Sequence, residues 1–532
     1  MKKQPLMPLI YSVILSIGVV FGIYIAKSNG IVSAQKNNSN ISFINDVFSL
    51  IDKEYVDTIN IKDLQIKAVN HVLESMDPHS EYIKPEILDD VNDNLLGSFH
   101  GIGVSFRIEK DTIAIINTIK GGPSEKAGIL AGDRIVYVDD TLVAGTKVTN
   151  KDAMRLLKGP KNTKVTVKIK RRGMEELLDF TIIRDVIPTH SVDVAYMIDD
   201  NIGFIKMTKF SATTHKEFVE AVKRLKAEGM TQLILDLRDN TGGYLGEAVN
   251  IVDEMLADNN LIVYTEGEHR DRSYIFSRRR GLWEDKDVVV LINEGSASAS
   301  EIVAGALQDN DRGTIIGRRS FGKGLVQEQF DLGENGALRL TIARYYTPTG
   351  RCIQKPFKGN KEEYMLEEYS RYETGEMFSI DSIHFADSLK YITPKGKIVY
   401  GGGGIMPDVY VPLANDSSRY FFNKMANSGI LFQYAFDYAD SHRKEILNYG
   451  DAQNFNDKFV FTDAIFNELM RRAEEKKITG NKEDKAKARE LSEPLFKAYV
   501  ARDVFDDEAF YLLYEPMDEI LQEAILKLKI EN

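Results

Sequence analysis

The spacing of apolar and polar residues first separates an N-terminal segment from the rest of the chain. Residues 6–26 are almost all apolar and follow Lys2 and Lys3, a pattern that predicts a membrane-spanning helix within residues 1–26 with its lysines in the cytoplasm. The small residues Val32, Ser33 and Ala34 favour an alternative, a cleaved signal peptide. Both interpretations put the remaining chain outside the cytoplasm, in the periplasm, either anchored to the cell membrane or secreted.

Short helical patterns come next. Residues 27–42 are rich in Asn and Ser and predict a linker. Over residues 43–92 apolar residues recur at helical spacing, which predicts two or three short helices, the last one ended by Pro78.

Residues 93–185 show the pattern of a compact module rich in β-strands. Apolar residues alternate over short runs separated by Gly and Asp, which favours strands over helices. The expected strands are 103–108, 112–119, 134–138, 164–169 and 177–183, and the expected helices are 124–127 and 151–157.

Over residues 186–412 apolar strands alternate with helices, which predicts an α/β core. The expected strands are 203–207, 233–237, 288–292, 314–316, 325–330 and 337–346, and the expected helices are 216–226, 246–257 and 298–309. Residues 413–532 are charged with helical periodicity, clearest at 466–476 and 515–529, and predict a helical extension. The chain is therefore expected to be a multidomain α/β protein.

Composition narrows the classes of function. The chain has 532 residues, 43% of them hydrophobic and 28% charged, which is typical of globular domains. Its formal net charge of −12 argues against nucleic acid as the main partner. One cysteine, Cys352, excludes an intrachain disulfide and a cysteine-based zinc site, and none of the eight histidines has zinc-protease spacing. We expect Cys352 to be a buried apolar residue, and we expect no metal or organic cofactor.

The first candidate for chemistry is a serine between a strand and a helix. A strand is expected to end at Ile292, followed by a turn and then a helix from Ser298. Ser296 and Ser300 compete with Ser298 for a role as nucleophile. Ser298 also begins a Ser-Ala-Ser-Glu capping box, which gives it an alternative structural role; a helix N-terminus would in either case favour a developing negative charge.

The second candidate is Lys323, which Gly322 and Gly324 flank. A lysine acts as a general base only where burial lowers its pKa, and side-chain-free neighbours let the backbone close over the amine. Residues 317–323 also read G-x-x-x-x-G-K, most of a phosphate-binding loop. The following Gly324 lacks the hydroxyl that binds Mg²⁺, and a strand rather than a helix is expected next, so nucleotide binding is disfavoured.

The module at residues 93–185 resembles a PDZ domain through two segments. One is Gly121–Asp133 (GGPSEKAGILAGD), which precedes the strand Arg134–Val138. The other is Gly101-Ile102-Gly103-Val104, which is similar to the PDZ loop that holds a peptide's terminal carboxylate. Successive N–H groups in a glycine-rich turn suit an anion, and a strand edge beside it accepts an added strand.

Two further segments resemble the carboxyl-terminal processing (tail-specific) serine proteases, namely Asn293–Leu307 (NEGSASASEIVAGAL) and Arg318–Gln327 (RRSFGKGLVQ). In that family the lysine follows the nucleophilic serine by 25 residues, which is the separation of Ser298 and Lys323. The resemblance also implies that Gln327 orients the lysine.

The segment Asp236–Gly243 (DLRDNTGG) resembles the family's oxyanion segment, although Thr241 replaces the usual proline. The resemblance implies oxyanion donors at Ala299 N–H and at either Gly242 or Gly243; a glycine-rich turn after a core strand is the structural alternative.

The resemblance implies a crotonase-like or ClpP-like protease core that cleaves peptide bonds through an acyl-enzyme. The PDZ domain would bind substrates with free, apolar C-termini, and a homo-oligomer or an adaptor protein is a further expectation. Two other functions stay open: a catalytically silent PDZ adaptor, and a binding protein for small apolar ligands on the same core fold.

Overall fold

A computed structural model of the chain describes residues 39–278, 280–414 and 416–530. The expected membrane helix, residues 1–26, lies outside these residues, and within them no helix is both long and apolar enough to cross a membrane. The chain divides into two compact units between Val72 and Leu73.

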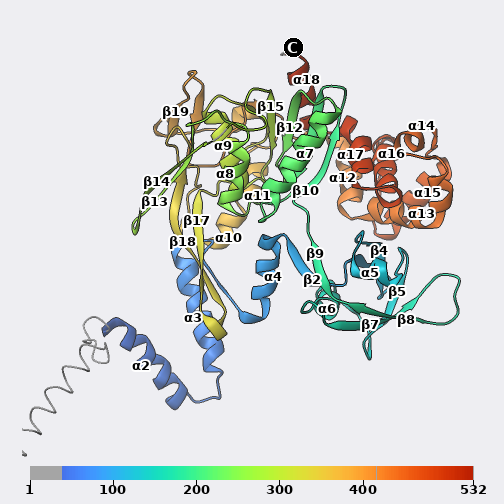
Figure 1. Cartoon of the computed structure of the whole chain (residues 1–532), viewed down its shortest axis with the longest axis horizontal. Helices are drawn as coiled ribbons and strands as arrows, with labels where there is room; N and C mark the ends of the chain where they lie inside the picture. Colours follow the sequence, from blue (N-terminus) through green and yellow to red (C-terminus); the bar gives the residue numbers. More distant parts are fainter. Residues whose placement is uncertain (1–38, 279, 415, 531–532) are drawn as a thin grey trace, which may run out of the picture. The chain divides into compact units, whose positions relative to one another are not determined.

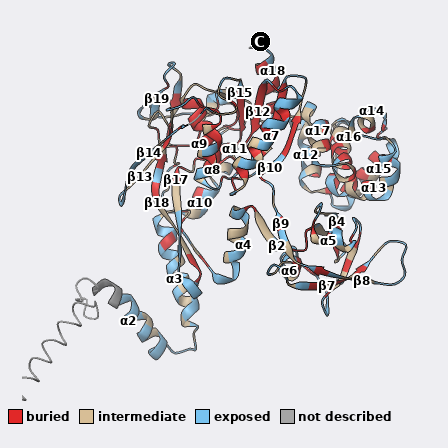
Figure 2. Cartoon of the chain, in the orientation of Figure 1, coloured by how far each residue is buried: buried red, intermediate tan, exposed pale blue. Residues whose placement is uncertain are grey.

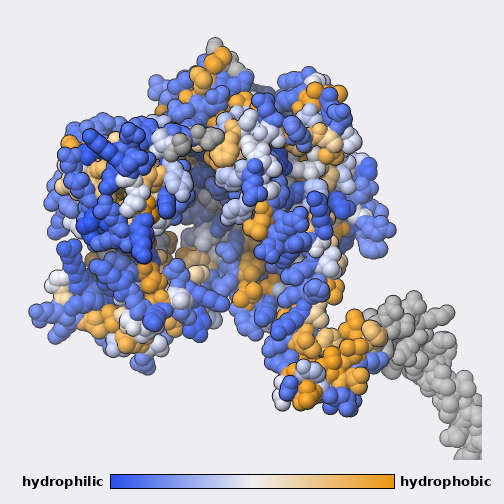
Figure 3. All heavy atoms as spheres, turned by 180° about the vertical axis from the view of Figure 1, so that it is seen from behind, coloured by the Kyte–Doolittle hydropathy of each residue, from blue (hydrophilic) through white to orange (hydrophobic). Residues whose placement is uncertain are grey.

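The first unit contains helix α2 (Ser39–Glu54) and most of α3 (Ile61–Met76), in agreement with the expected short helices. Several of their large apolar side chains are exposed, and they form the orange patch beside the grey atoms in Figure 3. The most exposed in α2 are Phe43, at 69%, and Leu50, at 63%.

The β-rich module contains every strand and helix expected for it (Figure 1). One sheet has the order β3-β4-β5-β7-β8, with β6 beside β5, and helices α5 and α6 complete the module. The elements are β3 (Val104–Ile108), β4 (Ile113–Thr118), α5 (Pro123–Ala127), β5 (Arg134–Val138), β6 (Thr141–Leu142), α6 (Asn150–Leu157), β7 (Lys164–Lys170) and β8 (Leu178–Ile183). The module has a hydrophobic core of its own, which includes Ile113, Ile135 and Val167.

The chain enters and leaves this module through a two-stranded antiparallel sheet. Strand β2 (Ser98–Gly101) pairs with β9 (Asp185–Pro188), and Gly101 lies opposite Asp185. Because paired residues lie about 5 Å apart, the module is inserted into the remaining fold through two adjacent strands.

The α/β core is built on a six-stranded sheet of order β10-β11-β12-β15-β16-β21. Its strands are parallel except β10, which is antiparallel to β11. The elements are β10 (Val192–Met197), β11 (Ile202–Met207), β12 (Gln232–Asp236), β15 (Val288–Ile292), β16 (Thr314–Gly317) and β21 (Val409–Tyr410). Strands β12 and β15 are entirely buried; β15 is apolar throughout, and β12 is apolar between Gln232 and Asp236.

Helices cover both faces of this sheet, and Figure 2 shows the interior as buried. One face packs against α7 (Thr214–Glu228), α8 (Leu245–Asp253) and α9 (Ala299–Asp309). The other face packs against α18 (Glu519–Ile530), through Ile520, Leu521, Ala524, Ile525 and Leu528. The expected helical extension at residues 413–532 therefore ends in a helix, α18, that packs against the core sheet.

A second sheet of order β1-β18-β13-β14, with β17 also paired to β18, adjoins the core. It contains β1 (Glu81–Ile83), β13 (Leu261–Gly267), β14 (Arg270–Phe276), β17 (Leu325–Asp331) and β18 (Ala337–Tyr346). Strands β13 and β14 were not among the expected strands: β14 begins with a polar run at residues 270–273, whereas the apolar run at residues 261–264 that opens β13 was overlooked.

Two further groups of elements belong to the chain outside the two sheets of the core: an insert before β21 and a group of C-terminal helices. Short helices α10 (Lys361–Met365) and α11 (Glu367–Glu373) and the hairpin of β19 (Lys390–Ile392) and β20 (Ile398–Tyr400) form an insert before β21. Helices α12 to α17 share a separate apolar core that includes Phe455, Leu469 and Phe496. They are α12 (Tyr420–Asn427), α13 (Ile430–Leu447), α14 (Ala452–Lys458), α15 (Asp463–Glu475), α16 (Lys482–Val504) and α17 (Asp507–Tyr514).

Candidate active site

Ser298 occupies a sharp turn between β15 and α9. Its backbone has φ 55° and ψ −110°, a conformation that costs free energy for a residue with a side chain and that occurs most often at functional sites. The residue lines a cavity of about 650 Å³, together with Lys323, Gln327, Gly242 and Gly243. Residues from three separate segments therefore meet at one concave surface.

The two competing serines have structural roles. The Ser296 hydroxyl donates to the carbonyl of Leu237 at 2.8 Å, and the Ser300 hydroxyl donates to the carbonyl of Asn240 at 2.8 Å. Both residues are completely buried. Of the three serines, Ser298 is the one that lines the cavity.

Lys323 also lines this cavity and lies just before β17. Its Nζ donates to Gln327 Oε1 at 2.9 Å, and Gln327 Nε2 donates to the carbonyl of His79 at 2.6 Å. Burial, followed by the positive charge of Arg339, lowers the pKa of Lys323. This is the direction that a general-base lysine requires.

The glycines beside Lys323 allow close backbone packing. A side chain at Gly324 would place its Cβ 2.8 Å from the backbone nitrogen of Gln354. Gly322 has φ 91°, in the left-handed region that favours glycine. Strand β17 follows directly, so this loop lacks the helix that a phosphate-binding loop would require.

Glu301 joins the serine segment to the lysine segment. Its buried carboxylate accepts the N–H groups of Ser298 at 2.8 Å and Lys323 at 2.9 Å through Oε2. Its Oε1 accepts the Ser320 hydroxyl at 2.5 Å and the N–H of Gly322 at 2.7 Å. Sequence reasoning considered Glu301 only as part of a capping box, because nothing in the sequence places residues 320–323 beside it.

The loop after β12 lies against the serine. A Cβ at Gly242 would come within 2.8 Å of Ser298 Cβ and 2.9 Å of Ala299 N, so only glycine fits. The Gly242 N–H donates to Asn240 Oδ1 at 2.9 Å, and it is therefore already engaged. Of the two glycines, Gly243 is the better candidate for an oxyanion donor, with Ala299 N–H at the start of α9.

His79 also contacts the lysine side of the site, a role that sequence reasoning missed. Its carbonyl holds Gln327, and its Nε2 lies 3.1 Å from the Tyr364 hydroxyl. Burial and the nearby Lys323 lower the pKa of His79 to about 3, so the imidazole is neutral at neutral pH. The sequence of residues 76–80, which includes His79, predicts only the end of a helix.

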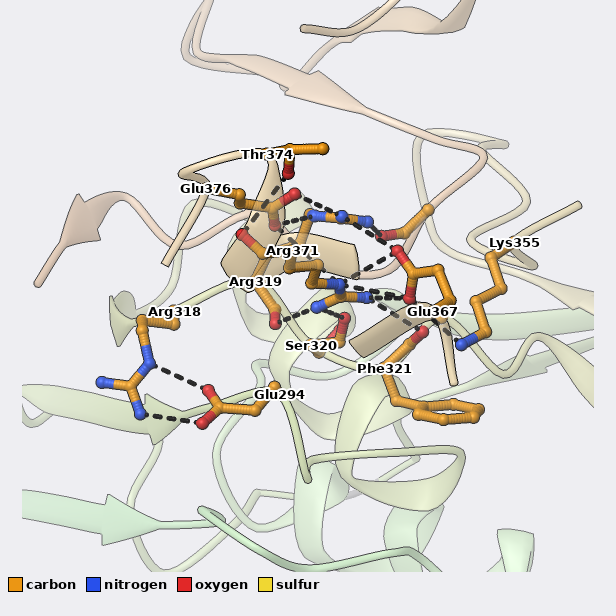
Figure 4. A network of polar contacts seen from close by, with 12 residues as sticks. Glu294, Arg318, Arg319, Ser320, Phe321, Lys355, Glu367, Arg371, Thr374 and Glu376 are labelled. Carbon is orange, nitrogen blue, oxygen red and sulfur yellow. Dashed lines mark hydrogen bonds and ion pairs between the residues drawn. The ribbon is translucent and has the colours of Figure 1, made fainter. Parts of the chain in front are cut away.

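The loop that leads to Lys323 is braced by a buried charge network from α11 (Figure 4). The Arg371 guanidinium donates to the carbonyls of Arg319 at 2.9 Å and Ser320 at 3.1 Å, and it pairs with Glu367 at 2.9 Å. Glu367 also pairs with Lys355 at 3.1 Å. The insert therefore holds the backbone a few residues before Lys323.

The PDZ-like module presents a separate groove of about 500 Å³ between β3 and α6. Gly101, Ile102, Gly103 and Val104 all line it, as expected for a carboxylate-binding loop. The loop is fixed from behind, because the Ser124 hydroxyl and N–H donate to the carbonyl of Ile102 at 2.6 and 3.0 Å. Asn94 of α4 (Pro85–Leu96) lines both this groove and the Ser298 cavity.

Cys352 lies outside the Ser298 cavity and is partly buried. Burial raises the pKa of its thiol, which disfavours the thiolate that a nucleophile needs.

Comparisons with known proteins place these features among peptidases. Residues 201–361 match peptidase family S41, and residues 101–182 match the PDZ domain. Residues 421–506 match a family of unknown function, DUF8443. The carboxy-terminal-processing protease of Bartonella bacilliformis is 39% identical over 62% of this chain and 76% of its own length. The carboxy-terminal processing protease CtpA of Bacillus subtilis is 32% identical over 69% of this chain and 78% of its own.

A solved structure titled photosystem II D1 C-terminal processing protease is also similar. It shares 24% identity, covering 71% of this chain and 94% of that chain, with a TM-score of 0.36.

Proposed function

This chain belongs to the carboxy-terminal processing serine proteases of peptidase family S41, and from that premise we propose that Ser298 and Lys323 form its catalytic dyad. The observation that carries the proposal is the convergence on one cavity of a serine with a strained backbone and a partly buried lysine of lowered pKa. Gln327 and Glu301 fix the lysine, one at its amine and the other at its backbone.

The reaction begins with neutral Lys323 accepting the proton of the Ser298 hydroxyl while the oxygen attacks a peptide carbonyl. The protonated lysine then returns the proton to the leaving amine as the C–N bond breaks, which leaves an acyl-enzyme. Water, deprotonated by the same lysine, attacks the ester and releases the new C-terminal acid and Ser298.

The tetrahedral intermediates carry a negative oxygen that backbone N–H groups stabilise. We assign Gly243 and Ala299 as donors, because the Gly242 N–H is bonded to Asn240. Ala299 N–H lies in the first turn of α9, where the helix dipole adds positive potential.

The PDZ module is proposed to recognise the substrate through its C-terminal tail. The tail's carboxylate would bind the loop at residues 101–104, and the tail would pair with β3 as an added strand. The Ser298 cavity is lined by Phe210, Ile302, Leu325 and Tyr345, which favours an apolar side chain at the cleaved bond.

For the N-terminal segment, the apolar run at residues 6–26 supports anchoring in the cell membrane with the protease in the periplasm. A cleaved signal peptide remains the alternative proposal. Fractionating cells that express the whole chain, and sequencing the mature N-terminus, distinguishes the two.

Mass spectrometry of cleavage products tests the dyad. The protein lacking residues 1–35 is incubated with an unstructured substrate that ends in a free apolar C-terminus, beside Ser298→Ala, Lys323→Ala and the control Ser296→Ala. We expect Ser298→Ala and Lys323→Ala each to lose more than about 10³-fold in kcat with the fold intact. Cleavage that survives in Ser298→Ala would rule out the assigned nucleophile. Ser296→Ala is expected to retain measurable cleavage, because its hydroxyl is buried and bonds to the carbonyl of Leu237.

A further inference from the structure

The C-terminal helix α18 begins beside a carboxylate, Asp518, that contacts Arg238, the residue that precedes loop 239–243. Asp518 immediately precedes this helix and caps it, accepting the N–H of Leu521 at 3.1 Å. The helix is anchored by its apolar packing on the sheet and by Gln232, whose side chain donates to the carbonyl of Leu528 at 3.1 Å. The position of Asp518 is therefore set by a whole helix and not by a mobile tail.

Asp518 forms a bidentate ion pair with Arg238, although the two residues are 280 positions apart in the chain. Arg238 Nη1 and Nη2 each lie 2.7 Å from one carboxylate oxygen of Asp518. The same guanidinium donates to both oxygens of Asp236, at 2.9 and 2.7 Å. Such paired, parallel contacts fix the plane of an arginine as well as its position.

The cluster is buried and electrically balanced. Lys206 pairs with Asp236 at 3.1 Å, so two cations face two carboxylates. The side-chain exposures are 12% for Lys206, 0% for Asp236, 13% for Arg238 and 10% for Asp518. Without Asp518, the cluster would hold an uncompensated positive charge away from water.

The residues after Arg238 form the loop that lies against the nucleophile. Asp239 and Asn293 exchange two hydrogen bonds at 2.8 Å, and the carbonyl of Asn240 accepts the N–H of Ala297 at 3.0 Å. The loop then reaches Gly242, in close contact with Ser298. A shift of Arg238 would therefore also shift the following loop, residues 239–243, which includes Gly243, the proposed oxyanion donor.

We propose that Asp518 is a positioning residue of this protease, which holds Arg238 so that loop 239–243 keeps its place against Ser298. Residues 201–361 match the peptidase family, so the carboxylate comes from outside the matched segment. The C-terminal helix is then part of the catalytic unit. The inference rests on the proposed role of Ser298.

The test compares Asp518→Asn, which keeps the shape and removes the charge, with Glu519→Gln. Glu519 is the next residue and pairs with Arg419 at 3.2 Å on the surface, so it is a matched control. At a temperature where all proteins are folded, we expect Asp518→Asn to lose about 10-fold in kcat with KM changed less than twofold, because the loop contacts the reacting atoms and not the distant substrate tail. Glu519→Gln should match the parent.

Hydrogen–deuterium exchange of residues 237–245 gives a readout that needs no cleavage. Exchange should be several-fold faster in Asp518→Asn than in the parent or in Glu519→Gln. Unchanged exchange would overturn the inference, whatever happens to kcat, since the loop would then not carry the effect. Faster exchange with unchanged kcat would overturn it too.

A double-mutant cycle with Arg238→Lys tests the connection. If Asp518 acts through Arg238, the double variant should lose no more kcat than the more impaired single variant, whereas additive losses would contradict that route. Failure of the dyad is recognised separately, by cleavage that persists in Ser298→Ala. Full activity of a folded Asp518→Asn, with Ser298→Ala inactive, would reject only the present inference.

Discussion

At the scale of single residues, the surroundings of Ser298 and Lys323 set their backbone conformation and pKa apart from those of other serines and lysines. Ser298 differs from Ser296 and Ser300 because its backbone is strained and its side chain lines the cavity, whereas theirs bond to carbonyls. Lys323 differs from a surface lysine because burial and Arg339 disfavour its charged form. The resemblance to a family predicted both residues as the dyad, and their surroundings are those that the proposed reaction requires.

The pH dependence of cleavage tests the role of Arg339. Only neutral Lys323 accepts a proton, so kcat/KM should fall as the pH falls through the pKa of this lysine. Arg339→Gln removes a positive charge that lowers that pKa, and the pKa should therefore rise. We expect the acid limb of the kcat/KM profile to move to higher pH.

Arg339→Lys is the control, because it keeps the charge and should leave the acid limb near its original position. A profile that shifts equally in both variants would show that packing, and not charge, is the cause. A shift of the Arg339→Gln profile to lower pH would contradict the argument outright.

At the scale of secondary-structure elements, the catalytic loops are held by segments that sequence reasoning did not connect to them. Helix α11 places Arg371 against the carbonyls before Lys323, and α18 places Asp518 against Arg238. Both interactions join segments far apart in the chain. The elements themselves were largely predicted from apolar spacing, since β15 is apolar throughout and β11 and β12 are mostly apolar.

Arg371→Met should destabilise the protein and reduce its activity. The change removes a cation that is 2% exposed and leaves two carbonyls of the loop unpaired. We expect the free energy of unfolding in urea to fall by about 3–5 kcal/mol, the usual cost of removing one partner of a buried ion pair. Because the loop carries Lys323, kcat should fall in the folded fraction as well.

Arg270→Met provides the comparison, because Arg270 pairs with Glu328 at a position where both side chains are about half exposed. Its loss should change the free energy of unfolding by less than about 1 kcal/mol. Equal effects of the two substitutions would refute the special role given to the α11 network.

At the scale of the whole molecule, the PDZ module and the protease core are separable in structure. The module has its own apolar core, and its two connections pair with each other through β2 and β9. The core, by contrast, depends on the far C-terminus, since α18 covers one face of its sheet.

Replacing residues 102–184 by a short Gly-Ser linker should leave a folded core. The ends to be joined lie next to Gly101 and Asp185, which are already paired. We expect Ser298 to remain reactive toward a fluorophosphonate probe, while the preference for substrates with a free C-terminus is lost. Both properties are measured by mass spectrometry, the second with matched substrates whose C-terminus is free or amidated.

A core that still discriminates between the two substrates would show that tail recognition does not reside in the PDZ module. In a parallel variant the chain ends after Pro516, which removes Asp518 and α18. That protein should fail to fold, because the apolar sheet face, including Phe204 and Leu291, would be exposed to water.

The sequence by itself determined most of the strands and helices and the PDZ module, and it predicted Ser298 and Lys323 as a dyad, because apolar periodicity and short motifs are local properties of the chain. It could not identify Glu301 as the link between Ser298 and Lys323, nor His79, Arg371 and Asp518 as supports of the site. Those roles depend on which distant segments meet, and the burial that lowers the pKa of Lys323 exists only when they do. The choice of Gly243 over Gly242 likewise followed from a hydrogen bond to Asn240 that no spacing predicts.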